Sequence, residues 1–331
     1  MSVNVAIAGA TGAVGQEFLT VLAERNFPIK TLRLLASGRS AGKTVEFRGQ
    51  THTVEELTRD SFKDIQIAFF SAGGSISNQS SGTISGYFAT YIGGTTGTID
   101  SAGRIAGGEQ GVRLNVAGVV INRSGGTISG NTAVYVANGA GTVFNLGTIS
   151  GGTYAVRFDA GHAHILQIDP SAVFTGKVEG GNTIGGAIVS TLQLRSGTSA
   201  GTLTSPGTQF VHFGRISVDT AANWTLSGET LSAGYTLVDN GTLTNAGTLS
   251  STVTVGVGAL FSNASGGVVT VTSGNAVYGT SAGAATVVNA GRIAGNTTTG
   301  NGVYLKGGGR VTNQAGTISG RFAVRARPPL P

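Results

Sequence analysis

The chain has 331 residues, of which 56 are glycine and only 11 % are charged, and its formal net charge is +6. It contains no cysteine, which excludes disulfides, thiolate metal sites and cysteine nucleophiles within these residues. No run of about 18 apolar residues is present, so no membrane-spanning helix is predicted. No basic leader precedes the first apolar run, so no secretory signal is expected.

Composition divides the chain after Ser77. Residues 1–77 carry 15 charged residues and 8 glycines, whereas residues 78–331 carry 21 and 48. The second part is rich in Gly, Thr, Ser, Asn and Val, which disfavour helices and suit strands and turns. Its basic residues are scattered singly, without an aromatic-interleaved stripe, so no nucleic-acid partner is expected.

The first part begins with the pattern of a nucleotide-binding α/β fold. The apolar run Val3–Ala8 predicts a buried parallel strand, a glycine turn follows at residues 9–15, and residues 31–36 predict a second strand. Glycines there let backbone N–H groups and a helix N-terminus approach a pyrophosphate. The intervening helix is predicted from apolar residues at helical spacing, namely Val14, Phe18, Val21 and Leu22.

The remainder of the first part predicts further strands. Residues 45–54 indicate a hairpin around Gly49, and residues 65–70 indicate another buried strand, followed by a glycine turn at residues 71–75. Three parallel strands and one helix form an incomplete sheet, which we expect to have unpaired edges and an uncovered face.

The loop after the second strand favours NADP over NAD. Dinucleotide-binding folds for NAD usually carry Asp or Glu there for the ribose 2′-hydroxyl. This chain has Ser37, Arg39 and Ser40 instead, which suit a 2′-phosphate. The alternative interpretation of Arg39 and Lys43 is a solvated basic loop.

The stretch from Val3 to Ser77 resembles the N-terminus of bacterial aspartate-semialdehyde dehydrogenase, with close matches over residues 5–18, 24–28, 34–42 and 70–75. The resemblance implies an NADP site in this segment. The expected cofactor-binding residues are Gly9, Thr11, Gly12, Ala13, Val14, Gly15, Ser37, Arg39, Ser40, Ser71 and Gly73.

The resemblance covers less than a quarter of the chain. The family acts through a cysteine thioester with a histidine acid/base and substrate-binding arginines, and those segments have no counterpart here. We therefore assign no catalytic residue, and expect no dehydrogenase turnover and at most weak NADP binding.

Residues 78–331 repeat a short phrase of the form Gly-Thr-Ile-Ser-Gly. The isoleucines Ile84, Ile105, Ile128 and Ile149 are 21, 23 and 21 residues apart. Two further apolar phrases accompany each repeat, and three short strands per period predict a right-handed parallel β-helix with Gly and Asn supplying left-handed corners. Residues 160–235 keep the composition but lose the strict period, and Pro170, Pro206 and Trp224 are expected to mark longer loops or irregular coils.

The repeat resembles the β-helical passenger regions of bacterial autotransporters and large adhesins. That resemblance implies an extracellular or outer-membrane setting and a host surface or glycan partner, whereas the missing export signal favours the cytoplasm. His162 and His164, two apart on a predicted strand with Asp159 nearby, are read as surface histidines, and no metal site is expected. The Asn-Arg-Ser sequon at Asn122 is attributed to composition.

The two resemblances meet at Gly74–Ser77, a phrase that fits both. Such a shared stretch is where a recombination, an engineered fusion or a sequence-assembly error would cross over. The sequence therefore predicts a chimera of residues 1–77, a truncated dinucleotide-binding module, and residues 78–331, a β-helix. Two functions remain open: a truncated NADP-binding segment joined to a rod, or a structural or adhesive β-helix capped by its N-terminal segment.

Overall fold

The computed structural model describes residues 2–58, 60–70, 74–94, 96–204, 206–228 and 231–326. Strands dominate these ranges, in which α1 (Ala13–Glu24) is the single α-helix and no helix is long and apolar enough to span a bilayer. Two compact units are present. One comprises Met1–Asp159 and Val173–Val178, and the other comprises Ala160–Ala172 and Glu179–Pro331.

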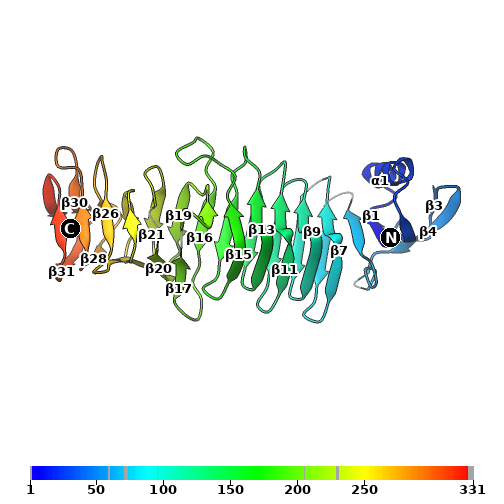
Figure 1. Cartoon of the computed structure of the whole chain (residues 1–331), viewed down its shortest axis with the longest axis horizontal. Helices are drawn as coiled ribbons and strands as arrows, with labels where there is room; N and C mark the ends of the chain where they lie inside the picture. The colour runs from blue at the N-terminus through cyan, green and yellow to red at the C-terminus, as the bar shows by residue number, and fades with distance from the viewer. Residues whose placement is uncertain are drawn as a thin grey trace. The chain divides into compact units, whose positions relative to one another are not determined.

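The first unit begins with a small Rossmann-like sheet (Figure 1). β1 (Val3–Ala8) pairs in parallel with β2 (Ile29–Ala36) and with β5 (Ile67–Phe70). The hairpin of β3 (Thr44–Phe47) and β4 (Gln50–Glu56) joins the sheet through parallel pairing of β4 with β2. These elements confirm the predicted strand–helix–strand order and the hairpin, whose turn holds Arg48 and Gly49 at φ 50° and 74°, as a two-residue hairpin turn requires.

The buried face of α1 differs in part from the predicted one. Val14 and Val21 are each 40 % exposed. Two of the predicted residues do face the sheet: Leu22 is buried with Leu19 in a core with Val5, Ile7 and Leu34 of β1 and β2, and Phe18 packs partly buried against it. The buried positions Gly15, Leu19 and Leu22 follow the i, i+4, i+7 spacing of one helix face, which β-branched Val14 and Val21 do not share.

Beyond Gly74 the first unit is a parallel β-solenoid, as predicted. Each coil contributes one strand to each of two parallel sheets, and the isoleucines of the repeat phrase stack in register. One sheet contains β6 (Ser75–Asn78), β8 (Gly97–Ser101), β10 (Gly118–Asn122) and β12 (Gly141–Asn145). The other contains β7 (Thr83–Ile92), β9 (Arg104–Leu114), β11 (Thr127–Val136), β13 (Thr148–Phe158) and β15 (Val173–Glu179).

The coils of the first unit have two strands where three were predicted. Two of the predicted phrases lie on one long strand, which bends at a shift of register, for example between Ser129 and Thr132 of β11. The shift lets Ile105 and Val112 of the paired strand β9, which are seven residues apart, both face the interior, where each is fully buried.

The second unit is a solenoid with three parallel sheets, as the three phrases predict. The first contains β14 (Ile165–Ile168), β16 (Thr191–Leu194), β19 (Arg215–Val218), β21 (Thr236–Asp239), β24 (Val253–Val255), β27 (Val277–Gly279), β30 (Asn301–Leu305) and β33 (Phe322–Ala326). The second contains β17 (Gly201–Thr204), β20 (Asn223–Ser227), β22 (Thr242–Asn245), β25 (Leu260–Asn263), β28 (Ala285–Asn289) and β31 (Gly309–Asn313). The third contains β23 (Thr248–Leu249), β26 (Val268–Thr270), β29 (Arg292–Ala294) and β32 (Thr317–Ser319), and the short β18 (Phe210–Val211) lies in the irregular stretch.

Trp224 does not mark a loop. It lies on β20, is 2 % exposed, and donates its indole N–H to the Arg195 carbonyl at 2.8 Å. The small Gly201 faces it on the paired strand β17, so this coil accommodates a large ring by removing a side chain beside it.

Asn138 adopts the expected left-handed corner, at φ 57°, whereas the asparagines that end strands of the repeat act through their side chains. Asn122, the asparagine of the sequon, is fully buried in the core. Its Nδ2 donates a hydrogen bond to Asn145 Oδ1 at 2.8 Å. In the second unit the same 2.8 Å bond recurs down a column of Asn245, Asn263, Asn289 and Asn313. Since the amides also donate to backbone carbonyls of the turns, each column ties one coil to the next.

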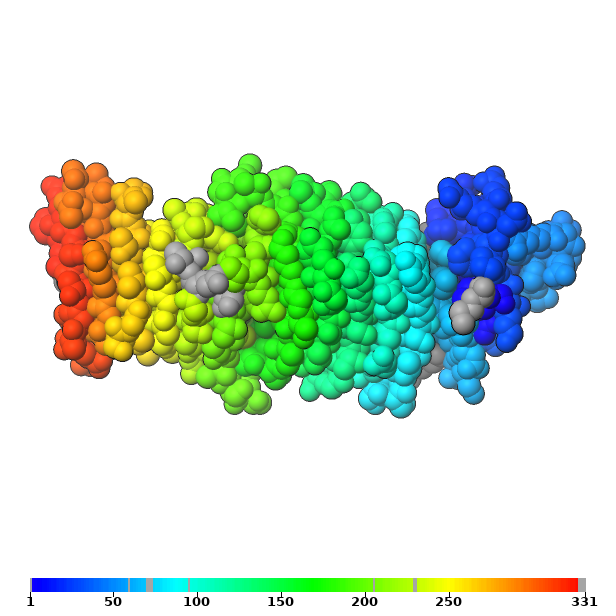
Figure 2. All heavy atoms as spheres, in the orientation of Figure 1, coloured from blue at the N-terminus to red at the C-terminus, as the bar shows by residue number. Residues whose placement is uncertain are grey.

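On its β5 side, the Rossmann-like sheet does not end in the unpaired edge that the sequence predicted. β5 pairs in parallel with β7 of the first coil, through Phe69 with Tyr91 and Phe70 with Ile92. Phe18 of α1 lies 5.1 Å from the Phe69 ring and 6.5 Å from the Tyr91 ring, centroid to centroid. The space-filling view shows the blue N-terminal residues directly against the cyan first coils (Figure 2).

The interior of the first coil is closed by the N-terminal segment. Phe62, Ile65 and Ala68 face the coil, and they leave a space of only about 10 Å³. The coil's side of this contact is formed by Ile76, Ile84, Ala89 and Thr90.

Candidate functional site: the carboxyl edge of the N-terminal sheet

The predicted glycine turn follows β1 directly. Gly9 has φ 80°, and its N–H and that of Ala10 donate to the Leu35 carbonyl at the end of β2, at 2.8 and 3.2 Å. A Cβ at Gly15 would lie 2.2 Å from the Gly9 carbonyl oxygen. The turn and the first helical turn are therefore as close as a phosphate-binding turn requires.

The N-terminus of α1 presents backbone donors at this turn. Gly12 is the N-cap residue and provides no side-chain hydrogen bond to the helix. The backbone N–H groups of Ala13, Val14 and Gly15 therefore have no hydrogen-bond partner within the helix and point out of its N-terminal end. Ala13 and Val14 are exposed. Such donors, with the helix dipole, suit an anion such as a pyrophosphate.

The second predicted loop lies at the same edge of the sheet. β1 and β2 are adjacent and parallel, so the residues after Ala8 and after Ala36 emerge side by side. The loop turns back on itself, because the N–H groups of Ser40 and Ala41 both donate to the Ser37 carbonyl. Arg39 at its tip is exposed, and the structure thus brings Gly9–Gly15 together with Ser37, Arg39 and Ser40.

An acidic residue that the sequence reasoning missed also lies at this loop. Glu56, at the carboxyl end of β4, lies against Gly38, since a Cβ there would be 2.9 Å from Glu56 Oε1. Glu56 is 20 residues beyond the end of β2 in the sequence, and it comes close to the loop only because β4 of the hairpin pairs in parallel with β2. Its carboxylate is an acceptor of the kind that binds ribose hydroxyls.

The third predicted part of the site, Ser71 and Gly73, lies outside the described residues. At the sheet position next to β5 the structure has β7 of the first coil. The nucleotide-binding sheet is therefore continued by solenoid strands on that side.

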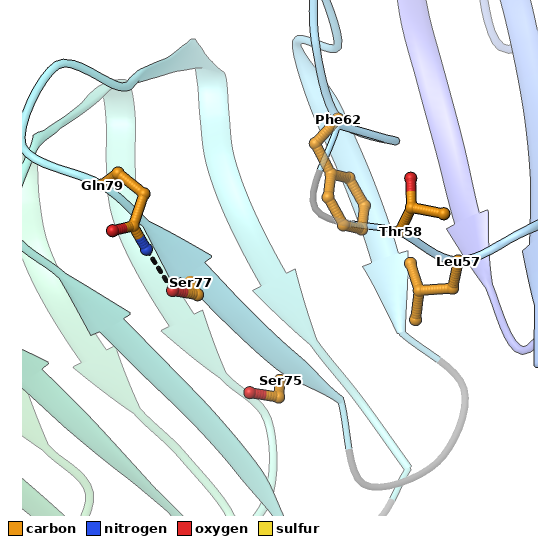
Figure 3. A pocket seen from close by; sticks show the side chains of 6 residues that line it. All are labelled: Leu57, Thr58, Phe62, Ser75, Ser77 and Gln79. Atoms are coloured by element: carbon orange, nitrogen blue, oxygen red, sulfur yellow. Dashed lines mark hydrogen bonds between the residues drawn. The ribbon is translucent and has the colours of Figure 1, made fainter.

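A separate cavity of about 370 Å³ lies between the residues after β4 and the strand β6. Figure 3 shows Leu57, Thr58 and Phe62 on one side and the polar side chains of Ser75, Ser77 and Gln79 on the other. Gln79 donates to the Ser77 hydroxyl at 2.9 Å (Figure 3). None of the six lining side chains is ionisable, so the cavity offers no general base among them.

The histidine pair is not on a strand. His162 and His164 lie in the loop before β14, with ring centroids 6.2 Å apart, and His164 is 1 % exposed, so it is not a surface histidine. Within the described ranges no three His, Asp or Glu side chains converge as metal ligands.

A strand, a glycine turn at a helix N-terminus and a second strand with a basic loop define a dinucleotide-binding segment. Comparison with known proteins agrees: residues 4–85 match the family profile of the semialdehyde dehydrogenase NAD binding domain. This match extends beyond residue 77, through β6 and into β7.

The curated relatives share only this segment. An aspartate-semialdehyde dehydrogenase of Legionella pneumophila is 60 % identical over 76 residues, 23 % of this chain and 22 % of that protein. The Bacillus subtilis enzyme is 57 % identical over 74 residues, 22 % of this chain and 21 % of that protein. A crystal structure of aspartate semialdehyde dehydrogenase II from Vibrio cholerae, complexed with ASA, is 51 % identical, with a TM-score of 0.21 over 22 % of this chain and 24 % of that one. The chain thus spans about a fifth of the length of the relatives it matches.

Proposed function

We propose that the N-terminal segment caps a structural β-solenoid and keeps the phosphate-binding part of an NADP site, without dehydrogenase turnover. The observation that carries the proposal is the pairing of β5 with β7. Solenoids need a covered end, because an open coil exposes its apolar interior and its strand edges. Here Phe62, Ile65 and Ala68 cover the interior and β5 covers one edge.

The cap is tested by placing a charge in the contact. Ala68 is 6 % exposed, so Ala68→Glu in the full chain puts a carboxylate into the closed interior. We expect faster hydrogen exchange at the amides of Ile84, Tyr91 and Ile92 in the first coil. Thr20→Glu, on the exposed face of α1, is the control and should leave these amides unchanged. If Ala68→Glu unfolds residues 2–70 while β7 keeps its protection, the segment is not a cap.

The nucleotide proposal rests on the two loops at the carboxyl edge. The donors at the start of α1 would hold the pyrophosphate, and Ser37, Arg39 and Ser40 would hold the 2′-phosphate of NADP. Glu56 opposes this preference, because a carboxylate beside Gly38 repels a 2′-phosphate and accepts a ribose hydroxyl.

Calorimetric titration with NADP and NAD tests this assignment. We expect Arg39→Gln to weaken NADP binding about tenfold, the loss of one charge-assisted hydrogen bond, and to leave NAD binding unchanged. Glu56→Gln should strengthen NADP binding. Lys43→Gln, which removes one positive charge from the same loop, is the control and should change NADP binding much less than Arg39→Gln does. An NADP affinity that Arg39→Gln leaves unchanged would show that this loop does not bind the 2′-phosphate.

Turnover is not expected, because the resemblance implies a cysteine thioester and the chain has no cysteine. Phosphate-dependent NADPH formation from aspartate semialdehyde that scales with purified protein would overturn this part of the proposal alone.

A further inference from the structure

Tyrosine and basic side chains form a continuous row on the outer face of the first unit. Tyr91, Arg113, Tyr135 and Arg157 occupy the same register position on β7, β9, β11 and β13. Their chain neighbours Ile92, Leu114, Val136 and Phe158 are buried, so strand alternation places the row on the opposite, outer face. We call this row, extended by Tyr154 and Lys177, the Tyr–Arg stripe.

The cations of the stripe lie against the rings. The Arg113 guanidinium is 5.9 Å from the Tyr91 ring centroid and 5.1 Å from that of Tyr135. The Arg157 guanidinium is 5.1 Å from the Tyr135 centroid and 5.5 Å from that of Tyr154, and Lys177 Nζ is 5.6 Å from the latter. These basic residues are far apart in the sequence, but the 21–23-residue period brings them together when the coils stack. The expectation that no stripe of alternating basic and aromatic residues exists was therefore wrong.

The two arginines of the stripe carry positive charges that are not paired with acidic side chains in the part of the chain that the structure describes. Neither Arg113 nor Arg157 forms an ion pair with an acidic residue in the described ranges, and Nε of Arg113 is buried without a hydrogen-bond partner. Arg113 donates from Nη2 to the neutral Asn115 at 3.1 Å. Two acidic side chains have other partners: Asp159 accepts a hydrogen bond from the Tyr135 hydroxyl at 2.9 Å, and Glu109 lies 3.4 Å from the Asn131 amide.

We propose that the Tyr–Arg stripe binds a linear acidic polysaccharide lying along successive coils. Paired strands are about 4.8 Å apart, so Arg113 and Arg157, two coils apart, present cations about 10 Å apart along one line. A polyuronate offers carboxylates repeated along an extended chain and hydroxyls between them. The guanidinium groups bind carboxylates by charge-assisted hydrogen bonds, and the phenol edges bind sugar hydroxyls.

The packing of the rings argues against single-stranded nucleic acid. Such ligands bind by stacking bases on free aromatic faces. Tyr135 has a guanidinium within 5.1 Å of its centroid from each neighbouring coil, so its ring faces are not available for bases. The stripe therefore offers edges and cations, which suit a hydroxyl- and carboxylate-bearing chain.

The test is binding of the full chain to immobilised polygalacturonate, with dextran as the neutral probe and oligo-dT as the nucleic-acid probe. We expect binding to polygalacturonate that weakens steeply with salt, and none to dextran. Arg113→Gln with Arg157→Gln should weaken it about a hundredfold, two charge-assisted bonds lost. Arg292→Gln with Arg310→Gln, an equal charge change in the second unit, is the control and should leave it nearly unchanged.

If the double variant does not fold, the single variant Arg157→Gln replaces it, because Arg157 is exposed and its substitution leaves the core intact. We expect Arg157→Gln to weaken binding to polygalacturonate about tenfold. Three results would overturn the proposal: no binding to polygalacturonate, an equal loss in the control pair, or oligo-dT binding that is stronger and lost in the same variants.

Discussion

At the scale of single residues, Asp239 is the buried acid whose environment most clearly perturbs it. It ends β21, is fully buried, accepts the Gly241 N–H at 3.0 Å through Oδ1, and has no partner at Oδ2. Burial raises the pKa of this carboxyl from 3.8 to about 7, although the Gly241 N–H bond opposes the shift. The folded protein therefore holds a proton on Asp239 at pH values where the unfolded chain has lost it.

This difference predicts that stability falls as pH rises between about 4 and 7. Below about pH 4 the carboxyl of Asp239 is protonated in both the folded and the unfolded state, so it does not lower the free energy of unfolding. Above that pH only the folded state keeps the proton, and the free energy of unfolding decreases by up to about 1.4 kcal/mol per pH unit until the folded carboxyl ionises near 7. Asp239→Asn keeps the acceptor for Gly241 and removes the charge. Urea unfolding at pH 5 and pH 8 should show the wild type losing stability at pH 8 and the variant losing much less. Equal losses in both proteins would contradict the assignment.

The limits of sequence reasoning are also visible in single residues. The turn at Gly9 and Gly12 was predictable, because a glycine turn between a strand and a helix has a chemistry that residue order alone expresses. The position of Arg39 in the loop after the second strand was predictable too, and its role toward a cofactor stays a prediction. Glu56 was not, because it reaches Gly38 only through the parallel return of β4 beside β2. The side-chain bond of buried Asn122 was not predictable for the same reason: its partner Asn145 is one full coil away.

At the scale of elements, the column of asparagines in the second unit ties strands to turns. Asn263 is 1 % exposed, and its Nδ2 donates to Asn289 Oδ1 and to the carbonyls of Gly267 and Arg292. Its own Oδ1 accepts from Asn245. Removing this amide leaves donors and acceptors of three coils unsatisfied in the interior.

We therefore predict that Asn263→Ala lowers the free energy of unfolding by about 3 kcal/mol or more, as several buried hydrogen bonds are lost together. Asn313→Ala, at the exposed end of the same column, is the matched control and should cost about 1 kcal/mol. Denaturant titration of the two variants compares them directly. A similar cost at both positions would mean that the column adds nothing beyond local turn bonds.

The strands themselves were largely predictable, because the repeat phrase marks both their period and their inward residues. The bend that merges two phrases into one strand in the first unit was not. It depends on a register shift between coils, for instance at Gly86–Phe88 against β9, which composition does not express.

At the scale of the whole molecule, the sequence predicted two kinds of construction, and both are present. It did not predict that they share a sheet, because the pairing of β5 with β7 joins residues about 20 positions apart without any motif. The Tyr–Arg stripe was missed in the same way: its members are separated by about one period each and become neighbours only when coils stack.

The short strand β6 gives the join a further meaning. Ser75, Ile76, Ser77 and Asn78 pair residue for residue with Thr98, Ile99, Asp100 and Ser101, so Ile76 points inward in step with Ile99. Strand side chains alternate with a period of two, and a displacement of one residue would turn Ile76 to solvent and Ser77 inward. The strand at the junction therefore already has the side-chain alternation of the coils that follow it. A different solenoid whose first strand pairs in this same register could follow Gly74–Asn78 and keep its apolar side chains inside.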